Sequence, residues 1–161
     1  MRTLLLGIGN ILMNDDAAGV LVVQALAEKY TFSQELVILD GGTLGLDLLP
    51  FLEGVDRLLV VDAVETGGAV GSIVRMTGDD IPLALATKVS PHQMGLKDLL
   101  LVADLQGYAP QEMVLWGVQP GSIEMDIKLS QEVAKSVDIL KIKVLEELEC
   151  WGITATLKLN G

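Results

Sequence analysis

Three aspartates and one histidine in this chain have the types and positions to perform chemistry together. Asp40 and Asp62 each end a short apolar run, Asp16 follows the first such run after a glycine-bearing segment, and His92 is the only histidine. Two carboxylates and one imidazole form an oxygen and nitrogen ligand set that suits zinc, nickel or a similar divalent ion, whereas calcium prefers oxygen alone. The sequence therefore predicts one metal-handling site formed by Asp16, Asp62 and His92.

The residues around His92 indicate how its side chain would be held. Ser90 and Gln93 have the spacing of a capping box, and Pro91 falls at the first position of the helix that they predict. His92 would then lie in the first turn, where the helix dipole disfavours imidazolium and so favours the neutral, metal-binding form. A purely structural histidine is the alternative interpretation.

The aspartates also have structural interpretations. Asn14 or Asp15 is expected to cap the first helix, which leaves Asp16 to face a ligand. Asp40 precedes two glycines and a threonine, so binding to loop amides is an equal alternative for it. Asp62 follows two valines of a buried strand, and this rigid anchor favours a functional role.

The apolar runs predict how these residues are positioned. Strands buried on both faces are expected at Thr3–Ile8, Leu36–Leu39 and Arg57–Val61, with helices at Asp16–Tyr30 and Leu44–Leu52. This alternation is typical of parallel βαβ units with helices on both faces of the sheet. Ligands bind outside the carboxyl ends of the strands in such sheets, which is where the aspartates stand.

The second half of the chain is less regular. Gly71–Met76 is expected to be an antiparallel strand, because its link to the preceding strand is too short for a crossover helix. We then expect a helix from Ser90 to Leu105, a strand at Met113–Val118 and a last helix at Ser130–Cys150. We predict one domain over residues 1–161, with no structure assigned to the tail 154–161.

Composition excludes several classes of function. The formal net charge of −11 disfavours nucleic acid and anionic membrane surfaces as partners, and it suits cations. No targeting segment and no apolar run of about 20 residues is present. The lone Cys150, predicted to be a small buried hydrophobe, fits a reducing compartment. We therefore expect a cytoplasmic protein.

The glycines of the first loop raise a nucleotide-binding alternative. Gly7 and Gly9 would let the backbone turn sharply and approach a ligand closely. The third glycine of a dinucleotide fingerprint is replaced by Leu12, so only half of the motif is present.

Five short motifs, in register over residues 1–153, resemble the hydrogenase maturation endopeptidases. They are Gly7-Ile8-Gly9-Asn10 with Asp15-Asp16 and Gly19, Asp40-Gly41-Gly42-Thr43, Asp62-Ala63, Ser90-Pro91-His92-Gln93 and Trp116-Gly117-Val118-Gln119-Pro120.

This resemblance implies an aspartyl endopeptidase that removes the C-terminal extension of a nickel–iron hydrogenase large-subunit precursor. It implies a three-layer α/β/α fold whose five-stranded sheet has one antiparallel strand. It also assigns Asp16, Asp62 and His92 as metal ligands, although some family members carry glutamate at the position of Asp16. The metal would be nickel supplied by the precursor, with zinc or cadmium as other occupants, and Asp40 is a candidate helper in orientation or proton transfer.

Two mechanisms and one rival class remain open at this point. A bound metal would activate water or polarise the scissile carbonyl, or the site would dock nickel already inserted in the precursor; the resemblance favours docking. The rival is a non-catalytic, nickel-sensing chaperone of the same precursor.

Overall fold

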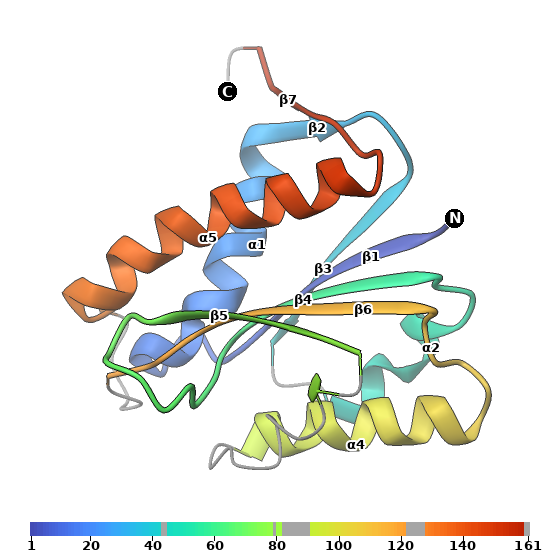
Figure 1. The fold of residues 1–161 in the computed structure, drawn as a ribbon, viewed down its shortest axis with the longest axis horizontal. Coiled ribbons are helices and arrows are strands. Elements are labelled where there is room, and N and C mark those ends of the chain that lie inside the picture. Colours follow the sequence, from blue (N-terminus) through green and yellow to red (C-terminus); the bar gives the residue numbers. More distant parts are fainter. Residues whose placement is uncertain (43–44, 79, 82–90, 122–127, 160–161) are drawn as a thin grey trace.

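A five-stranded sheet forms the centre of the computed structural model, with strand order β3-β1-β4-β6-β5 (Figure 1). Four strands are parallel, and β5 runs antiparallel to β6. The strands are β1 (Thr3–Ile8), β3 (Leu36–Gly42), β4 (Arg57–Ala63), β5 (Ile73–Thr77) and β6 (Glu112–Val118). The structure describes residues 1–42, 45–78, 80–81, 91–121 and 128–159, without the side chains of 45–46 and 91–96. The predicted mostly parallel sheet with one antiparallel strand is confirmed.

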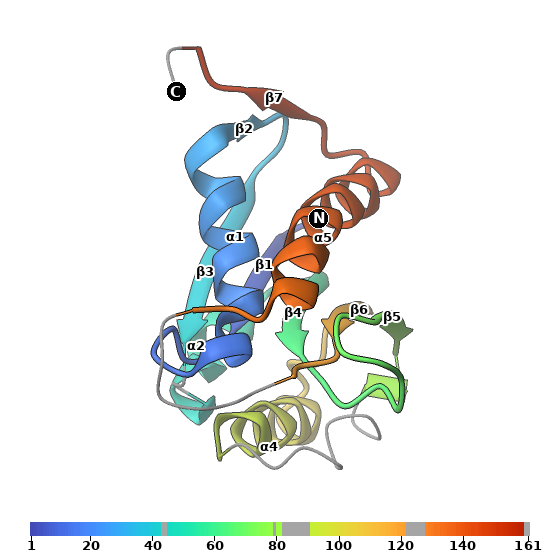
Figure 2. The same ribbon diagram turned by 90° about the vertical axis from the view of Figure 1, so that its left-hand side faces the viewer.

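Helices cover both faces of this sheet, as Figure 2 shows end-on. One face carries α1 (Ala18–Lys29) and α5 (Gln131–Cys150), and the other carries η2 (Gly45–Leu48), α2 (Leu49–Leu52) and α4 (Pro91–Leu105). All six residues of β1 are buried because each face of the strand meets a layer of helices. The three-layer α/β/α arrangement therefore follows from apolar strands that must be covered on both sides.

The first two predicted helices differ from the structure at their starts. The chain forms a 3-10 turn, η1 (Asn14–Ala17), before α1 begins. In the region predicted as one helix, η2 precedes the short α2, whose first turn contains Pro50. Proline lacks the amide that a continuous helix needs from its interior residues, so regular α-helix begins only next to it.

A second, two-stranded sheet was not predicted. It pairs β2 (Tyr30–Phe32) antiparallel with β7 (Ala155–Leu157), so part of the unassigned tail is ordered. Each strand has only three residues, too few for a recognisable pattern. Cys150 is exposed, so its predicted burial is wrong. It lies two residues after the buried Leu148, which places it on the opposite side of α5.

The order of the strands creates a topological switch point. From β1 the chain crosses to β3 on one side, and it later returns to β4 on the other side of β1. α1 connects parallel strands and runs antiparallel to them, and α4 also begins at the carboxyl edge of the sheet (Figure 1). In doubly wound sheets this edge, at the switch point, is the usual place for a ligand. No helix of the described residues is long and apolar enough to span a membrane.

Candidate functional site

Asp62 is the last residue but one of the central strand β4, at the carboxyl edge. Its side chain is fully buried, and its Oδ1 accepts a hydrogen bond of 2.8 Å from the backbone N–H of Ala63. The alternation of β4 places Asp62 on the same face as Leu58 and Val60, which pack in the core beneath α2 and α4. Asp62 thus belongs to the face of the sheet that α4 covers, as required for a site shared with the start of that helix.

Asp16 lies in η1, which packs against β4. The side chain is buried, and its Oδ2 accepts a hydrogen bond of 3.1 Å from the backbone N–H of Asn10. The structure therefore brings the turn that carries Asp16 onto the strand that carries Asp62. It joins the two predicted carboxylate positions at the switch point between β1 and β4.

Glycines permit this close packing. A Cβ at Gly19 would overlap the carbonyl oxygen of Val61, and a Cβ at Gly9, whose φ is +139°, would overlap the carbonyl oxygen of Asp16. Gly7 lies equally close to the start of α1, because its Cβ would meet the Gly19 carbonyl oxygen at 2.8 Å. The glycines of the first loop thus allow the chain to approach itself. Whether Gly7 and Gly9 also approach a ligand, as the sequence predicts, stays a prediction.

Asp15, next to Asp16, has a structural role. Its side chain is completely buried and accepts hydrogen bonds from the backbone N–H of Gly121 at 2.7 Å and from the N–H and hydroxyl of Ser130, both at 2.8 Å. Ser130 is the N-cap of α5. Neither Asn14 nor Asp15 caps η1, so the predicted capping of the first helix is wrong. Asp15 instead fastens the first loop to the start of the last helix, through contacts between segments distant in sequence.

Asp40 lies near the end of β3 and is exposed. Its Oδ1 accepts a hydrogen bond from the backbone N–H of Gly42 at 3.0 Å, which confirms the loop-amide interaction considered for it. Its Oδ2 accepts a second bond, 2.8 Å long, from the side chain of Gln24 on α1. Sequence reasoning missed Gln24, because nothing in a helical pattern shows which strand end a surface residue will meet.

His92 lies in the first turn of α4, which begins at Pro91 as predicted. The helix starts at the carboxyl edge, the same edge at which Asp16 and Asp62 lie. The side chain of His92, together with Ser90 and the predicted capping box, lies outside the described residues. Among the described side chains no group of three histidine, cysteine or acidic residues is arranged to hold a metal. The three-residue ligand set therefore stays a prediction.

Gln119 is a second polar residue whose role the sequence did not indicate. It directly follows β6 and is buried. Its Oε1 accepts hydrogen bonds from the backbone N–H and the hydroxyl of Thr66, at 2.7 and 3.0 Å. Its Nε2 donates to Glu65 at 3.0 Å. These bonds hold the loop that leaves β4 just beyond Asp62, so Gln119 supports the carboxyl edge.

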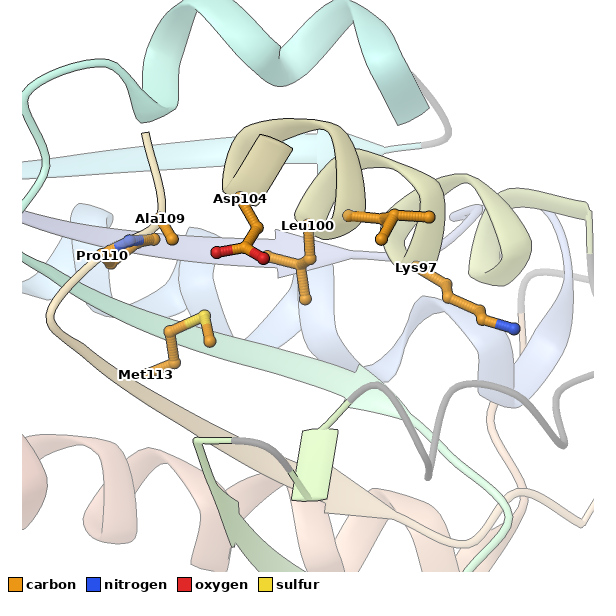
Figure 3. Close-up of a pocket in the computed structure, with 7 residues that line it drawn as sticks. Lys97, Leu100, Asp104, Ala109, Pro110 and Met113 are labelled. Carbon is orange, nitrogen blue, oxygen red and sulfur yellow. The ribbon is translucent and has the colours of Figure 1, made fainter. Parts of the chain in front are cut away.

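An apolar pocket of about 200 Å³ lies apart from these residues (Figure 3). It opens between α4 and the beginning of β6, at the amino edge of the sheet. Its lining residues are Lys97, Leu100, Leu101, Asp104, Ala109, Pro110 and Met113. This position and lining exclude it from the site at the carboxyl edge.

The fold and the site together define a three-layer, doubly wound α/β protein with buried carboxylates at its topological switch point. A family model described as hydrogenase maturation protease matches residues 20–147. The chain belongs to this family, and it is a peptidase.

Individual relatives agree with this assignment along nearly the whole chain. The hydrogenase 2 maturation protease of Escherichia coli K12 is 38% identical over 96% of this chain and 95% of its own length. The hydrogenase expression/formation protein HupD of Rhodobacter capsulatus is 43% identical over 96% of this chain and 75% of its own length. The solved structure of the hydrogenase maturating endopeptidase HybD from E. coli superposes with a TM-score of 0.93, at 37% identity and 98% coverage of each chain.

Proposed function

We propose that this peptidase removes the C-terminal extension of a nickel–iron hydrogenase large-subunit precursor after nickel has been inserted. Asp16, Asp62 and His92 grip the nickel of the precursor and so place the scissile bond beside the carboxyl edge of the sheet. The nickel is part of the substrate in this proposal. Zinc or cadmium, which accept the same ligands, would occupy the site only in its absence.

The burial of two carboxylates at the switch point is the observation that carries the proposal. Asp16 is 1% exposed and Asp62 is 0% exposed, so water would screen their attraction for a bound cation only weakly. Both residues are borne by backbone that cannot shift easily, since Asp62 is part of the central strand and Gly9 packs on the Asp16 carbonyl. Rigidly held ligands are what recognition of one metal geometry requires.

The start of α4 supports His92 as the third ligand. The partial positive charge at this helix end disfavours a second positive charge on the imidazole ring, so the neutral form is favoured. Neutral imidazole binds nickel, and two carboxylates with one imidazole leave positions open for the ligands that the precursor already supplies.

The family resemblance favours recognition of the substrate's nickel over a resident metal centre. In hydrolysis the peptide C–N bond breaks, the carbonyl carbon gains the hydroxyl of water, and the released amine gains a proton. Binding to nickel in the precursor would restrict this reaction to precursors that hold their metal. The rival chaperone hypothesis has no support from the family to which the chain belongs, whose description is that of a protease.

The test is processing of nickel-loaded and nickel-free precursor, followed by intact mass spectrometry. Wild-type protein is expected to shorten only the nickel-loaded precursor, since only that form offers the ion. His92→Ala is expected to lose processing while it retains its circular dichroism spectrum and melting temperature.

Equal cleavage of the nickel-loaded and nickel-free precursors would refute recognition of the precursor's nickel and favour a resident metal. Normal processing by folded His92→Ala would remove His92 from the site. Binding of nickel-loaded precursor without a change in its mass would contradict proteolysis and support the chaperone.

A further inference from the structure

We infer that Asp40 and the pocket beside it form a subsite for a positively charged side chain of the substrate segment, close to the scissile bond. This inference rests on the proposed function and adds to it the charge of a substrate residue. The pocket has a volume of about 210 Å³ and is lined by Gly9, Asn10, Ile11, Asp40 and Gly42. Asp40 is thereby assigned to substrate binding and not to proton transfer.

The pocket adjoins the proposed nickel site through the backbone. The N–H of Asn10, a lining residue, donates to the Asp16 carboxylate at 3.1 Å. The N–H of Gly9 donates to the carbonyl of Gly42 at 3.1 Å, which joins the loops after β1 and β3 into one wall. A peptide held at Asp16 by a bound nickel ion would therefore pass this pocket with a neighbouring residue.

The charge of the pocket selects a cation. Asp40 is the only charged residue among those that line it in the described part of the chain. Both groups that donate to its carboxylate, the Gln24 amide and the Gly42 backbone N–H, are neutral, so they orient the carboxylate without cancelling its charge. Each carboxylate oxygen can accept a further hydrogen bond, as an ammonium or guanidinium group requires.

The local backbone turns Asp40 toward this position. The pairing of β1 with β3 shifts from Gly7↔Asp40 to Ile8↔Gly42, which leaves Gly41 as an extra residue in β3. Such a bulge redirects the strand end, and bulges are common beside functional sites. Ile11, which is 49% exposed, supplies an apolar wall suited to the methylene stem of lysine or arginine.

The experiment exchanges charge on both sides of the contact. Intact mass first locates the bond that the wild-type protein cleaves, and each residue flanking that bond is then replaced by Lys or by Glu in nickel-loaded precursor. At one of these flanking positions, the precursor that carries Lys is expected to be processed about tenfold faster than the precursor that carries Glu. This ratio corresponds to the loss of one charge-assisted hydrogen bond. Asp40→Lys is expected to reverse this order.

Two further variants separate the local contact from general effects. Glu28→Lys makes the same change in net charge at an exposed position one turn further along α1, and it is expected to keep the wild-type preference. Gln24→Leu removes the bond that orients Asp40 and is expected to reduce the preference without reversing it.

Binding of a fluorescent peptide that spans the C-terminal region of the precursor is measured in parallel by anisotropy. Processing without a charge preference, or with the same preference in Asp40→Lys, overturns the inference and leaves the proposed function intact. If no precursor is processed, the proposed function fails, and peptide binding decides alone. Tighter binding of the Lys peptide, reversed in Asp40→Lys, then supports the subsite, and equal binding overturns it.

Discussion

At the scale of single residues, the adjacent Asp15 and Asp16 are both buried but have different partners. Asp15 is surrounded by donors from Gly121, which lies shortly after β6, and from Ser130, the N-cap of α5. The Asp16 carboxylate accepts from the Asn10 amide of its own loop and lies at the switch point. The sequence predicts a structural role for Asp15 and a ligand-facing role for Asp16, but it does not show the partners of either carboxylate.

We predict that Asp15→Ala lowers the free energy of unfolding by about 3 kcal/mol, because it leaves buried donors without their charged acceptor. Urea denaturation followed by circular dichroism measures this change. Asp16→Asn serves as the matched control, since an amide oxygen can still accept from Asn10, and its unfolding is expected to change by less than about 1 kcal/mol. Equal stability of Asp15→Ala and wild type would contradict the structural role of Asp15.

At the scale of elements, an ion pair joins α5 to the antiparallel edge of the sheet. Glu147 of α5 accepts hydrogen bonds from Arg75 of β5 at 2.7 and 3.1 Å and from the indole N–H of Trp116 of β6 at 3.0 Å. The hydrogen bond from Arg75 holds the pKa of the Glu147 carboxyl below its ordinary value, against the opposing effect of burial, and Trp116 adds to the lowering. The same contact raises the pKa of Arg75.

We predict that the stabilisation from this ion pair is lost in acid. A carboxyl whose pKa is lower in the folded state stabilises the protein above its unfolded pKa, and this contribution disappears as the pH falls through the folded pKa. The stabilisation is therefore present at neutral pH and declines once the pH drops below about 4.3, the ordinary pKa of glutamate.

Glu147→Gln is the variant that tests this prediction. It is expected to cost about 1–2 kcal/mol at neutral pH, a figure reduced because the Arg75 side chain is 45% exposed. The difference from wild type should shrink below about pH 4 in a series of urea titrations. A constant difference across the series would show that Glu147 contributes through packing and not through its charge.

At the scale of the whole molecule, the proposed site and the small sheet lie at opposite ends. Both α1 and α5 run from the carboxyl edge of the large sheet to its amino edge, where β2 and β7 follow them (Figure 1). The small sheet is held by the pairing of β2 with β7 and by the backbone bonds Ser33–Thr154 and Lys158–Lys29, each 2.9 Å long.

Truncation after Thr154 is therefore expected to lower the melting temperature by about 2–4 °C, which corresponds to about 1 kcal/mol in a chain of this size. Processing of nickel-loaded precursor should stay within about twofold of wild type, because the tail and the proposed site lie at opposite ends of the molecule. A twofold change in rate corresponds to about 0.4 kcal/mol in the activation free energy. Calorimetry and intact mass provide the two readouts. Loss of processing by a truncated protein that remains folded would place the tail in the substrate-binding surface.

Much of this architecture was determined by the sequence alone. Runs such as Leu4–Ile8 have no polar residue to face solvent, so they had to become strands buried on both faces, with helices around them. The short link before β5 could hold no crossover helix, which fixed its antiparallel direction. The positions of Asp40 and Asp62 at strand ends followed from the same pattern.

Only the tertiary structure decided which acid serves which role. Asp15 meets Ser130, Gln24 meets Asp40, and Gly9 packs on the Asp16 carbonyl. The bulge at Gly41 and the pairing of β2 with β7 were likewise absent from any local pattern. Hydrophobic periodicity records whether a residue is buried, which is a local property. The partner of a polar side chain depends on how distant segments pack, and that is settled only when the layers come together.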